Sequence, residues 1–159
     1  MNNTEKIKDL LKEILSKMNV SFEEIVVVDD GKSETPKISV KSSDSALLIG
    51  VRGANLFALN HLLKRIVTKG KTEQNEETKF FVDVNDYQVK LNEELKNRAK
   101  IMSDRARSFK VDVELDPMSS YERMIIHSAL QEQVDIKTES KGFGKDRRVV
   151  IRYVEEGQS

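Results

Sequence analysis

The sequence of 159 residues contains no cysteine and no net charge of either sign. Without cysteine the chain can form neither a disulfide framework nor a thiolate zinc site. Its N-terminus has no apolar run of the kind that a signal peptide or a membrane span needs, so we expect a cytoplasmic protein without membrane insertion. The net charge of zero argues at first against a nucleic-acid-binding protein.

Motifs of the common catalytic sites are also missing. There is no Gly-x-x-x-x-Gly-Lys-Ser/Thr phosphate loop, no Gly-x-Ser-x-Gly elbow and no thiol nucleophile. The two histidines, His61 and His127, are far apart in sequence and give no metal-ligand spacing. Acidic pairs such as Asp29-Asp30 and Glu76-Glu77 are typical of turns and loops. We therefore expect no catalytic activity, no metal and no cofactor.

Positive charge is concentrated in parts of the chain. Residues 41–71 carry six Lys or Arg and one acidic residue, whereas residues 1–40 carry six against eight. Residues 98–153 carry twelve against nine. Because the local field matters more than the total, these basic segments keep nucleic-acid binding open.

The first half predicts a helix, two strands, a short helix, a glycine loop, a second helix and a strand. A helical stripe of apolar residues lies between Ile7 and Met18, and β-branched residues around Phe22–Val28 and Ile38–Val40 predict a hairpin. The other expected elements are a turn at Asp29–Lys32, a short helix near Ser45–Leu48, a helix over 54–67, a solvated loop over 69–79 and a strand at Phe80–Val84. In the second helix, the expected core stripe is Leu56, Leu59, Leu62, Leu63 and Ile66.

The second half predicts a long helix, a strand, a helix and two more strands. Asp86 is the expected N-cap of the long helix, whose apolar pattern reaches Phe109. Alternation over Val111–Leu115 predicts a strand, and Ser119 or Ser120 can cap a helix that runs to about Gln131. The last two strands are expected at Val134–Ser140 and Arg147–Tyr153.

Two stretches resemble a known family. The element order of the first half is that of a type II KH domain, and Ile49–Leu56 resembles the KH signature of bacterial Jag-type (SpoIIIJ-associated, KhpB-like) proteins. Glu114–Ser119, Tyr121–His127 and Arg147–Ile151 resemble the Arg-x-x-x-His domain of that family. The resemblance implies an α+β fold, with a type II KH domain over 1–85 and a connecting helix plus Arg-x-x-x-His domain over 86–159. We expect no counterpart of the family's N-terminal Jag domain.

The resemblance implies two nucleic-acid-binding sites. In the first, the loop Gly50, Val51, Arg52, Gly53 would bring backbone N–H groups and the positive end of the following helix to a phosphate chain. In the second, Arg123 and His127 stand at i and i+4 on one helix face, where Arg can bind phosphate and His can bond or stack. Lys141, Arg147 and Arg148 would form a basic rim, although plain solvated residues explain much of this charge equally well. Phe57 lies off the core stripe, and we expect a neighbouring loop to cover it.

These features favour a single-stranded RNA-binding protein. The resemblance further implies post-transcriptional regulation in a bacterial cytoplasm, with a small single-KH protein as a partner, and leaves a homo-oligomer open. Two alternatives remain: a protein-interaction adaptor that docks a partner through the glycine loop and Phe57, and a binder of single-stranded DNA.

Overall fold

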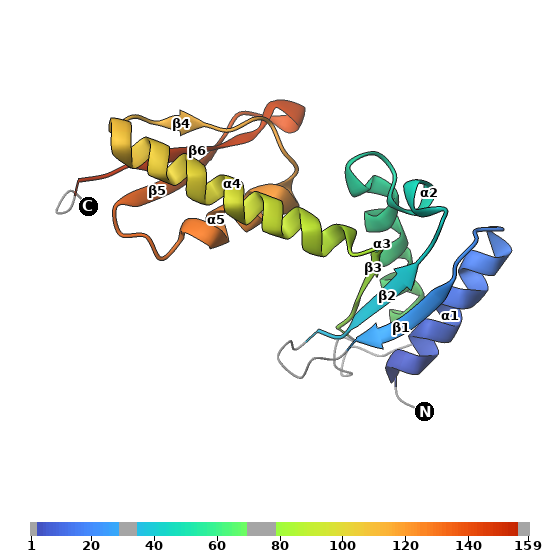
Figure 1. Cartoon of the computed structure of the whole chain (residues 1–159). Helices are drawn as coiled ribbons and strands as arrows, with labels where there is room; N and C mark the ends of the chain where they lie inside the picture. Colours follow the sequence, from blue (N-terminus) through green and yellow to red (C-terminus); the bar gives the residue numbers. More distant parts are fainter. Residues whose placement is uncertain (1–2, 29–34, 70–78, 156–159) are drawn as a thin grey trace. The chain divides into compact units, whose positions relative to one another are not determined.

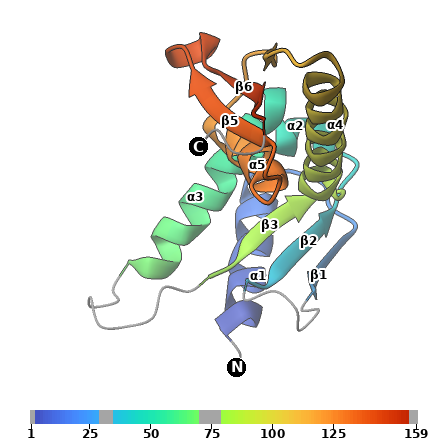
Figure 2. The same ribbon diagram turned by 90° about the vertical axis from the view of Figure 1, so that its left-hand side faces the viewer.

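A computed structural model describes residues 3–28, 35–69 and 79–155 and divides into two compact units, Met1–Gln88 and Val89–Ser159. Each unit packs helices on a small three-stranded sheet, so the expected α+β class is confirmed. Figures 1 and 2 show these elements from two directions.

Unit 1 has the sheet order β1-β2-β3, with β1 and β2 antiparallel and β2 and β3 parallel. Helices α1 and α3 pack on one face of this sheet (Figure 2). The predicted order of elements is confirmed, but the turn expected at Asp29–Lys32 and residues 70–78 of the expected loop lie outside the described residues. The elements are α1 (Asn3–Lys17), β1 (Glu24–Val28), β2 (Lys37–Lys41), α2 (Ser45–Ile49), the 3-10 turn η1 (Val51–Gly53), α3 (Ala54–Thr68) and β3 (Phe81–Val84).

The buried face of α3 differs from the predicted stripe. Leu56, Leu59 and Leu63 are buried as expected, but Leu62 and Ile66 are 48% and 40% exposed. The reason is Asn60, which occupies the buried side: its amide accepts the Val82 N–H at 2.7 Å and donates to the Val82 carbonyl at 2.9 Å. Because this polar side chain bonds the edge of β3, the face of α3 toward the sheet is rotated away from Leu62 and Ile66.

Unit 2 has an antiparallel sheet in the order β4-β6-β5, with α4 and α5 supplying the remaining core residues (Figure 1). The predicted strand at Val111–Leu115 is shorter than expected, since only Val113 and Glu114 are strand residues. Phe109, at the end of the long helix, is 70% exposed. The elements are α4 (Tyr87–Phe109), β4 (Val113–Glu114), α5 (Ser120–Leu130), β5 (Ile136–Lys141), the 3-10 turn η2 (Gly144–Asp146) and β6 (Arg148–Tyr153).

The starts of the two helices α4 and α5 depend on different caps. Ser119 caps α5 as predicted, and Glu122 bonds back to the Ser119 N–H to complete a capping box. At α4 the predicted cap is Asp86, but the carboxylate that accepts the Gln88 N–H, at 2.9 Å, belongs to buried Asp83. Asp86 instead lies 2.6 Å from the Lys37 ammonium group, with its backbone in the left-handed region. The cap was missed because Asp83 belongs to a strand in sequence.

One stretch, Ser45–Thr68, is long and apolar enough by composition to cross a membrane. Its backbone is not a continuous helix, since Gly50, Arg52 and Gly53 all have positive φ. Its buried residues, Leu48, Leu56, Leu59 and Leu63, belong to the core of unit 1. These residues therefore serve the core of unit 1, and the composition alone does not make the stretch a membrane span.

Candidate nucleic-acid interface

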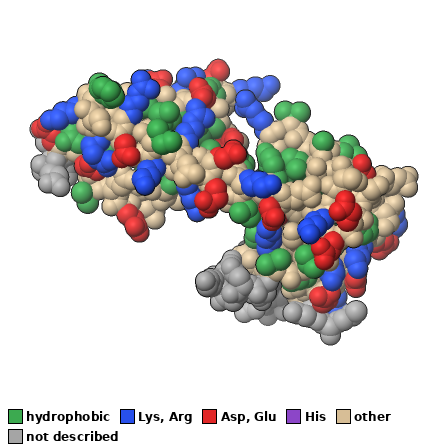
Figure 3. Space-filling view, in the orientation of Figure 1, with side chains coloured by type: hydrophobic (Ala, Val, Ile, Leu, Met, Phe, Trp, Pro, Cys, Tyr) green, Lys and Arg blue, Asp and Glu red, His purple; other side chains and the backbone are tan. Residues whose placement is uncertain are grey.

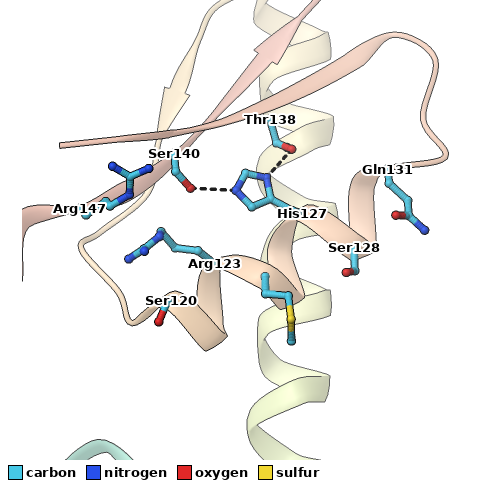
Figure 4. Close-up of a pocket in the computed structure, with 9 residues that line it drawn as sticks. Ser120, Arg123, His127, Ser128, Gln131, Thr138, Ser140 and Arg147 are labelled. Carbon is cyan, nitrogen blue, oxygen red and sulfur yellow. Dashed lines mark hydrogen bonds between the residues drawn. The ribbon is translucent and has the colours of Figure 1, made fainter. Parts of the chain in front are cut away.

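An open hollow of about 440 Å³ lies between α5 and β5 in unit 2. Two arginines, one histidine and several hydroxyl groups line it, and Met124 adds an apolar wall. Figure 4 shows both guanidinium groups on the Ser140 side of the imidazole, with Ser128 and Gln131 on its other side. The lining residues are Ser120, Arg123, Met124, His127, Ser128, Gln131, Thr138, Ser140 and Arg147.

His127 is fixed in the hollow by two hydroxyl groups. Its Nδ1 lies 2.7 Å from Thr138 Oγ1 and its Nε2 lies 2.9 Å from Ser140 Oγ (Figure 4). Burial, and secondly the charge of Arg123, lower the pKa of His127 from its ordinary value of 6.5. The imidazole is therefore neutral at pH 7, with one nitrogen donating and the other accepting, and a hydroxyl group can satisfy either.

Arg123 and Arg147 are held in place by backbone carbonyls rather than by carboxylates. Arg123 Nη1 donates to the Met118 carbonyl at 2.7 Å, and Arg147 Nη1 donates to the Gly142 carbonyl at 3.0 Å. No carboxylate in the described ranges forms an ion pair with either guanidinium group. Since each group has five N–H donors, most of them stay available to a ligand. Four other arginines of unit 2 do pair with carboxylates: Arg98, Arg107, Arg148 and Arg152.

Lys141 and Arg148 do not join this hollow. They face each other across β5 and β6, and cross-strand partners share a face of the sheet. Because side chains alternate along a strand, Thr138 and Ser140 point to the α5 side while Lys141 points to the other. There Lys141 lies 3.2 Å and Arg148 4.0 Å from Glu114. Of the three rim residues expected from the sequence, only Arg147 lies beside Arg123 and His127.

The glycine loop of unit 1 is a tight turn between α2 and α3. Gly50 and Gly53 have φ of 72° and 78°, and Arg52 between them has φ of 53°. A Cβ at Gly50 would lie 2.6 Å from Asn55 Cγ, and one at Gly53 would lie 2.9 Å from the Tyr87 ring. Both glycines are thus required by the turn and by packing inside the unit, which is a reason that the sequence did not show.

A second open hollow, of about 590 Å³, adjoins this loop. Its wall is mostly apolar and backbone, and the hydroxyl group of Ser45, the amide of Asn55 and the ring of Tyr87 are its polar or aromatic side chains. Val51 is 85% exposed at the loop, beside Arg52, which is also exposed. Figure 3 shows hydrophobic side chains at the surface where α2 and this loop lie.

Phe57 is not covered by a neighbouring loop of the described chain. It is 73% exposed on α3, contrary to the expectation from the sequence. On the face of unit 2 that Figure 3 shows, basic and acidic side chains are interspersed. The described residues hold no cluster of His, Asp or Glu that could bind a metal ion.

Sequence reasoning placed Arg123, His127 and Arg147 among the site residues but missed the groups that position them. Thr138 and Ser140 carried no role in it, and neither did the carbonyls of Met118 and Gly142. The alternation of Ile136, Thr138 and Ser140 is the signal that could have found the hydroxyl pair, because a buried Ile136 fixes which face of β5 meets α5.

Residues 93–153, which contain the whole hollow, were compared with known families. They match the family named for an arginine and a histidine separated by three residues, the Arg-x-x-x-His domain. The domain of this type expected from the sequence is therefore confirmed, and α5 carries its Arg123 and His127. Helix α4 from Glu93, both strands of the hairpin and the loop that precedes Arg147 all fall within the match.

The chain also has homologues along most of its length. A protein of Clostridium symbiosum named RNA-binding protein KhpB is 29% identical over 154 residues, which are 97% of this chain and 68% of that protein. The protein of the same name from Bacillus subtilis (strain 168) is 34% identical over 130 residues, or 80% of this chain and 61% of that protein. The chain thus spans about two thirds of the length of these relatives. Their names are those of RNA-binding proteins and not of enzymes.

Proposed function

We propose that the chain binds single-stranded RNA, with the hollow of unit 2 as its principal phosphate site. The observation that carries the proposal is the pair of guanidinium groups, Arg123 and Arg147, which are held by carbonyls beside a neutral imidazole. Guanidinium groups bind phosphate through paired N–H donors, and single-stranded nucleic acid is gripped by such charges together with stacking surfaces. The names of the homologues support RNA as the ligand.

Unit 1 would supply a second grip as a type II KH domain. Its support is the element order, the mixed sheet and the loop from Gly50 to Gly53 with Arg52 exposed at its tip. Backbone N–H groups at the loop and at the start of α3 would attract phosphate, while bases would lie in the adjoining hollow. Lys141 and Arg148 would add only a weaker contact at the rim, since both lie close to Glu114.

The biological role that we propose is post-transcriptional regulation in a bacterial cytoplasm, by a Jag-type, KhpB-like protein with a small single-KH protein as partner. A protein-interaction adaptor is the second candidate, because Phe57 and Val51 expose apolar surface in unit 1. Binding of single-stranded DNA would use the same surface as RNA.

Salt-titrated affinity separates these candidates. For RNA binding, log affinity for a short single strand should fall linearly with log salt, by about 0.7 for each phosphate contact. A DNA strand of matched sequence measured in parallel shows whether the 2′-hydroxyl matters. Affinity that is undetectable at low salt for both nucleic acids would reject the proposal and leave the adaptor.

A further inference from the structure

The hairpin loop between β5 and β6 presents an aromatic side chain that the RNA site described above does not use. Phe143 is 89% exposed, more than any other large hydrophobic side chain of the described residues. Its loop joins Ser140 to Arg147, and both of those residues line the hollow of unit 2. Phe143 therefore stands at the end of the loop that borders the proposed phosphate site.

The loop is an ordered turn and holds its shape without the Phe143 side chain. Asp146 N–H donates to the Phe143 carbonyl at 3.1 Å, and Arg147 Nη1 donates to the Gly142 carbonyl at 3.0 Å. Gly142 and Gly144, on either side of Phe143, have φ of +92° and +54°, and a Cβ at Gly142 would lie 3.0 Å from the Asp146 carbonyl oxygen. The backbone thus fixes where Phe143 stands, and nothing in its side chain is needed for the turn.

Arg147 links this loop to the hollow. The same guanidinium group that faces the hollow bonds the carbonyl of Gly142, the residue directly before Phe143. A phosphate bound by Arg147 would therefore lie near the base of the loop, with the aromatic ring a short way along the strand.

The surroundings of Phe143 favour a nucleobase over a protein partner. Residues 141–148 carry four Lys or Arg and one acidic residue, and Phe143 is their one exposed large hydrophobic side chain. Protein docking sites centre on a cluster of apolar anchors, whereas an isolated aromatic ring among cations is typical of single-strand binding, where each base offers a face to stack on.

We propose that Phe143 stacks on a base of the strand whose phosphate Arg123 and Arg147 bind. This inference rests on the proposed RNA binding and adds to it a base contact, which the two arginines and the neutral histidine do not supply.

The chain contains no tryptophan, so Phe143→Trp introduces a single fluorescent reporter. Titration with a short oligoadenylate should quench this tryptophan in step with binding of the labelled oligomer, and an abasic oligomer of the same length should not quench it. Phe109→Trp, which places the reporter at a 70% exposed position of the same unit, should stay unchanged and serves as the matched control.

Affinity measurements complete the test. Phe143→Ala should weaken oligoadenylate binding about 5- to 20-fold, the lower part of the range for base–aromatic stacking, without changing the salt slope, since no charge is lost. Phe143→Tyr should retain wild-type affinity. If the wild type binds oligoadenylate while Phe143→Ala binds equally well and Phe143→Trp is not quenched, the stacking contact is wrong and RNA binding stands. If the wild type does not bind, both proposals fail.

Discussion

The two units differ in what their hollows are made of. In unit 1 the hollow beside Gly50 and Gly53 is lined mainly by backbone and apolar side chains, and the exposed cation of its loop is Arg52. In unit 2 the lining is mainly polar side chains, and two guanidinium groups held by backbone carbonyls face it. The first arrangement can attract phosphate chiefly through N–H groups, whereas the second does so through full charges. The contrast predicts that affinity and its salt dependence reside mostly in unit 2.

The largest effect is expected from Arg123→Ala/Arg147→Ala. Each guanidinium group offers charged hydrogen bonds worth about 1.5–3 kcal/mol, so RNA affinity should fall about 100-fold or more. The plot of log affinity against log salt should flatten by about 1.4, twice the value for one phosphate on a single strand.

The matched control removes two cations from the opposite face of the same sheet. Lys141→Ala/Arg148→Ala should cost less than about 3-fold in affinity at moderate salt, because these charges act through a screened field. Equal losses in the two double variants would mean that charge, and not the hollow, decides binding.

A smaller loss is expected from Val51→Asp/Arg52→Asp in unit 1. Two added carboxylates would repel phosphate at the exposed loop, and affinity should fall about 10-fold, the size of one charged contact. Circular dichroism should be unchanged, because both side chains are exposed. Lys12→Asp on the exposed side of α1 controls for net charge. A loss larger than that of the Arg123→Ala/Arg147→Ala variant would reverse the contrast between the units.

His127 should affect stability as well as binding. His127→Ala leaves the half-buried hydroxyl groups of Thr138 and Ser140 without their partner, so the free energy of unfolding should fall by about 1–3 kcal/mol. Ser128→Ala, in the same hollow but exposed, should change it by less than about 0.5 kcal/mol. Denaturant unfolding measures both, and equal stabilities would show that the two hydroxyl contacts contribute nothing.

The pH dependence of stability follows from the lowered pKa of His127. As pH falls below its ordinary value of 6.5, the unfolded chain takes up the proton before the folded one does. The stabilisation from the neutral imidazole is therefore complete above pH 6.5 and is lost as pH falls toward the folded pKa. His127→Gln should remove this part of the dependence while His61 remains as background in both proteins.

The smallest effect is expected for Phe57→Ala. Since the ring is 73% exposed, the free energy of unfolding should change by less than about 0.5 kcal/mol. A loss of about 3–5 kcal/mol, as for a core aromatic, would contradict the exposed position.

Sequence patterns predicted the elements of both units because their apolar periods are regular. They failed where one polar side chain replaced an apolar one. Asn60 shifted the buried face of α3 and left Leu62 and Ile66 exposed, and Asp83, a strand residue, took the cap expected from Asp86. A helical wheel treats such residues as surface, although a backbone partner can hold them inside.

The site shows the same limit. The spacing of Arg123 and His127 placed both on one helix face, but nothing in the spacing shows that Thr138 and Ser140 fix the imidazole. Likewise, Lys141 and Arg148 flank Arg147 in sequence and yet lie on the other face of the sheet, because the side chains of neighbouring strand residues alternate.

The measurement that tests the central claim most directly is a nuclear magnetic resonance titration of the full chain with a short single-stranded RNA, observing the arginine Nε–H and histidine ring signals. We predict that Arg123, Arg147 and His127 shift together and saturate at one concentration, while Arg148 and Arg152 change little. Shifts confined to Arg148 and Arg152, with His127 unchanged, would place the RNA on the opposite face and contradict the account.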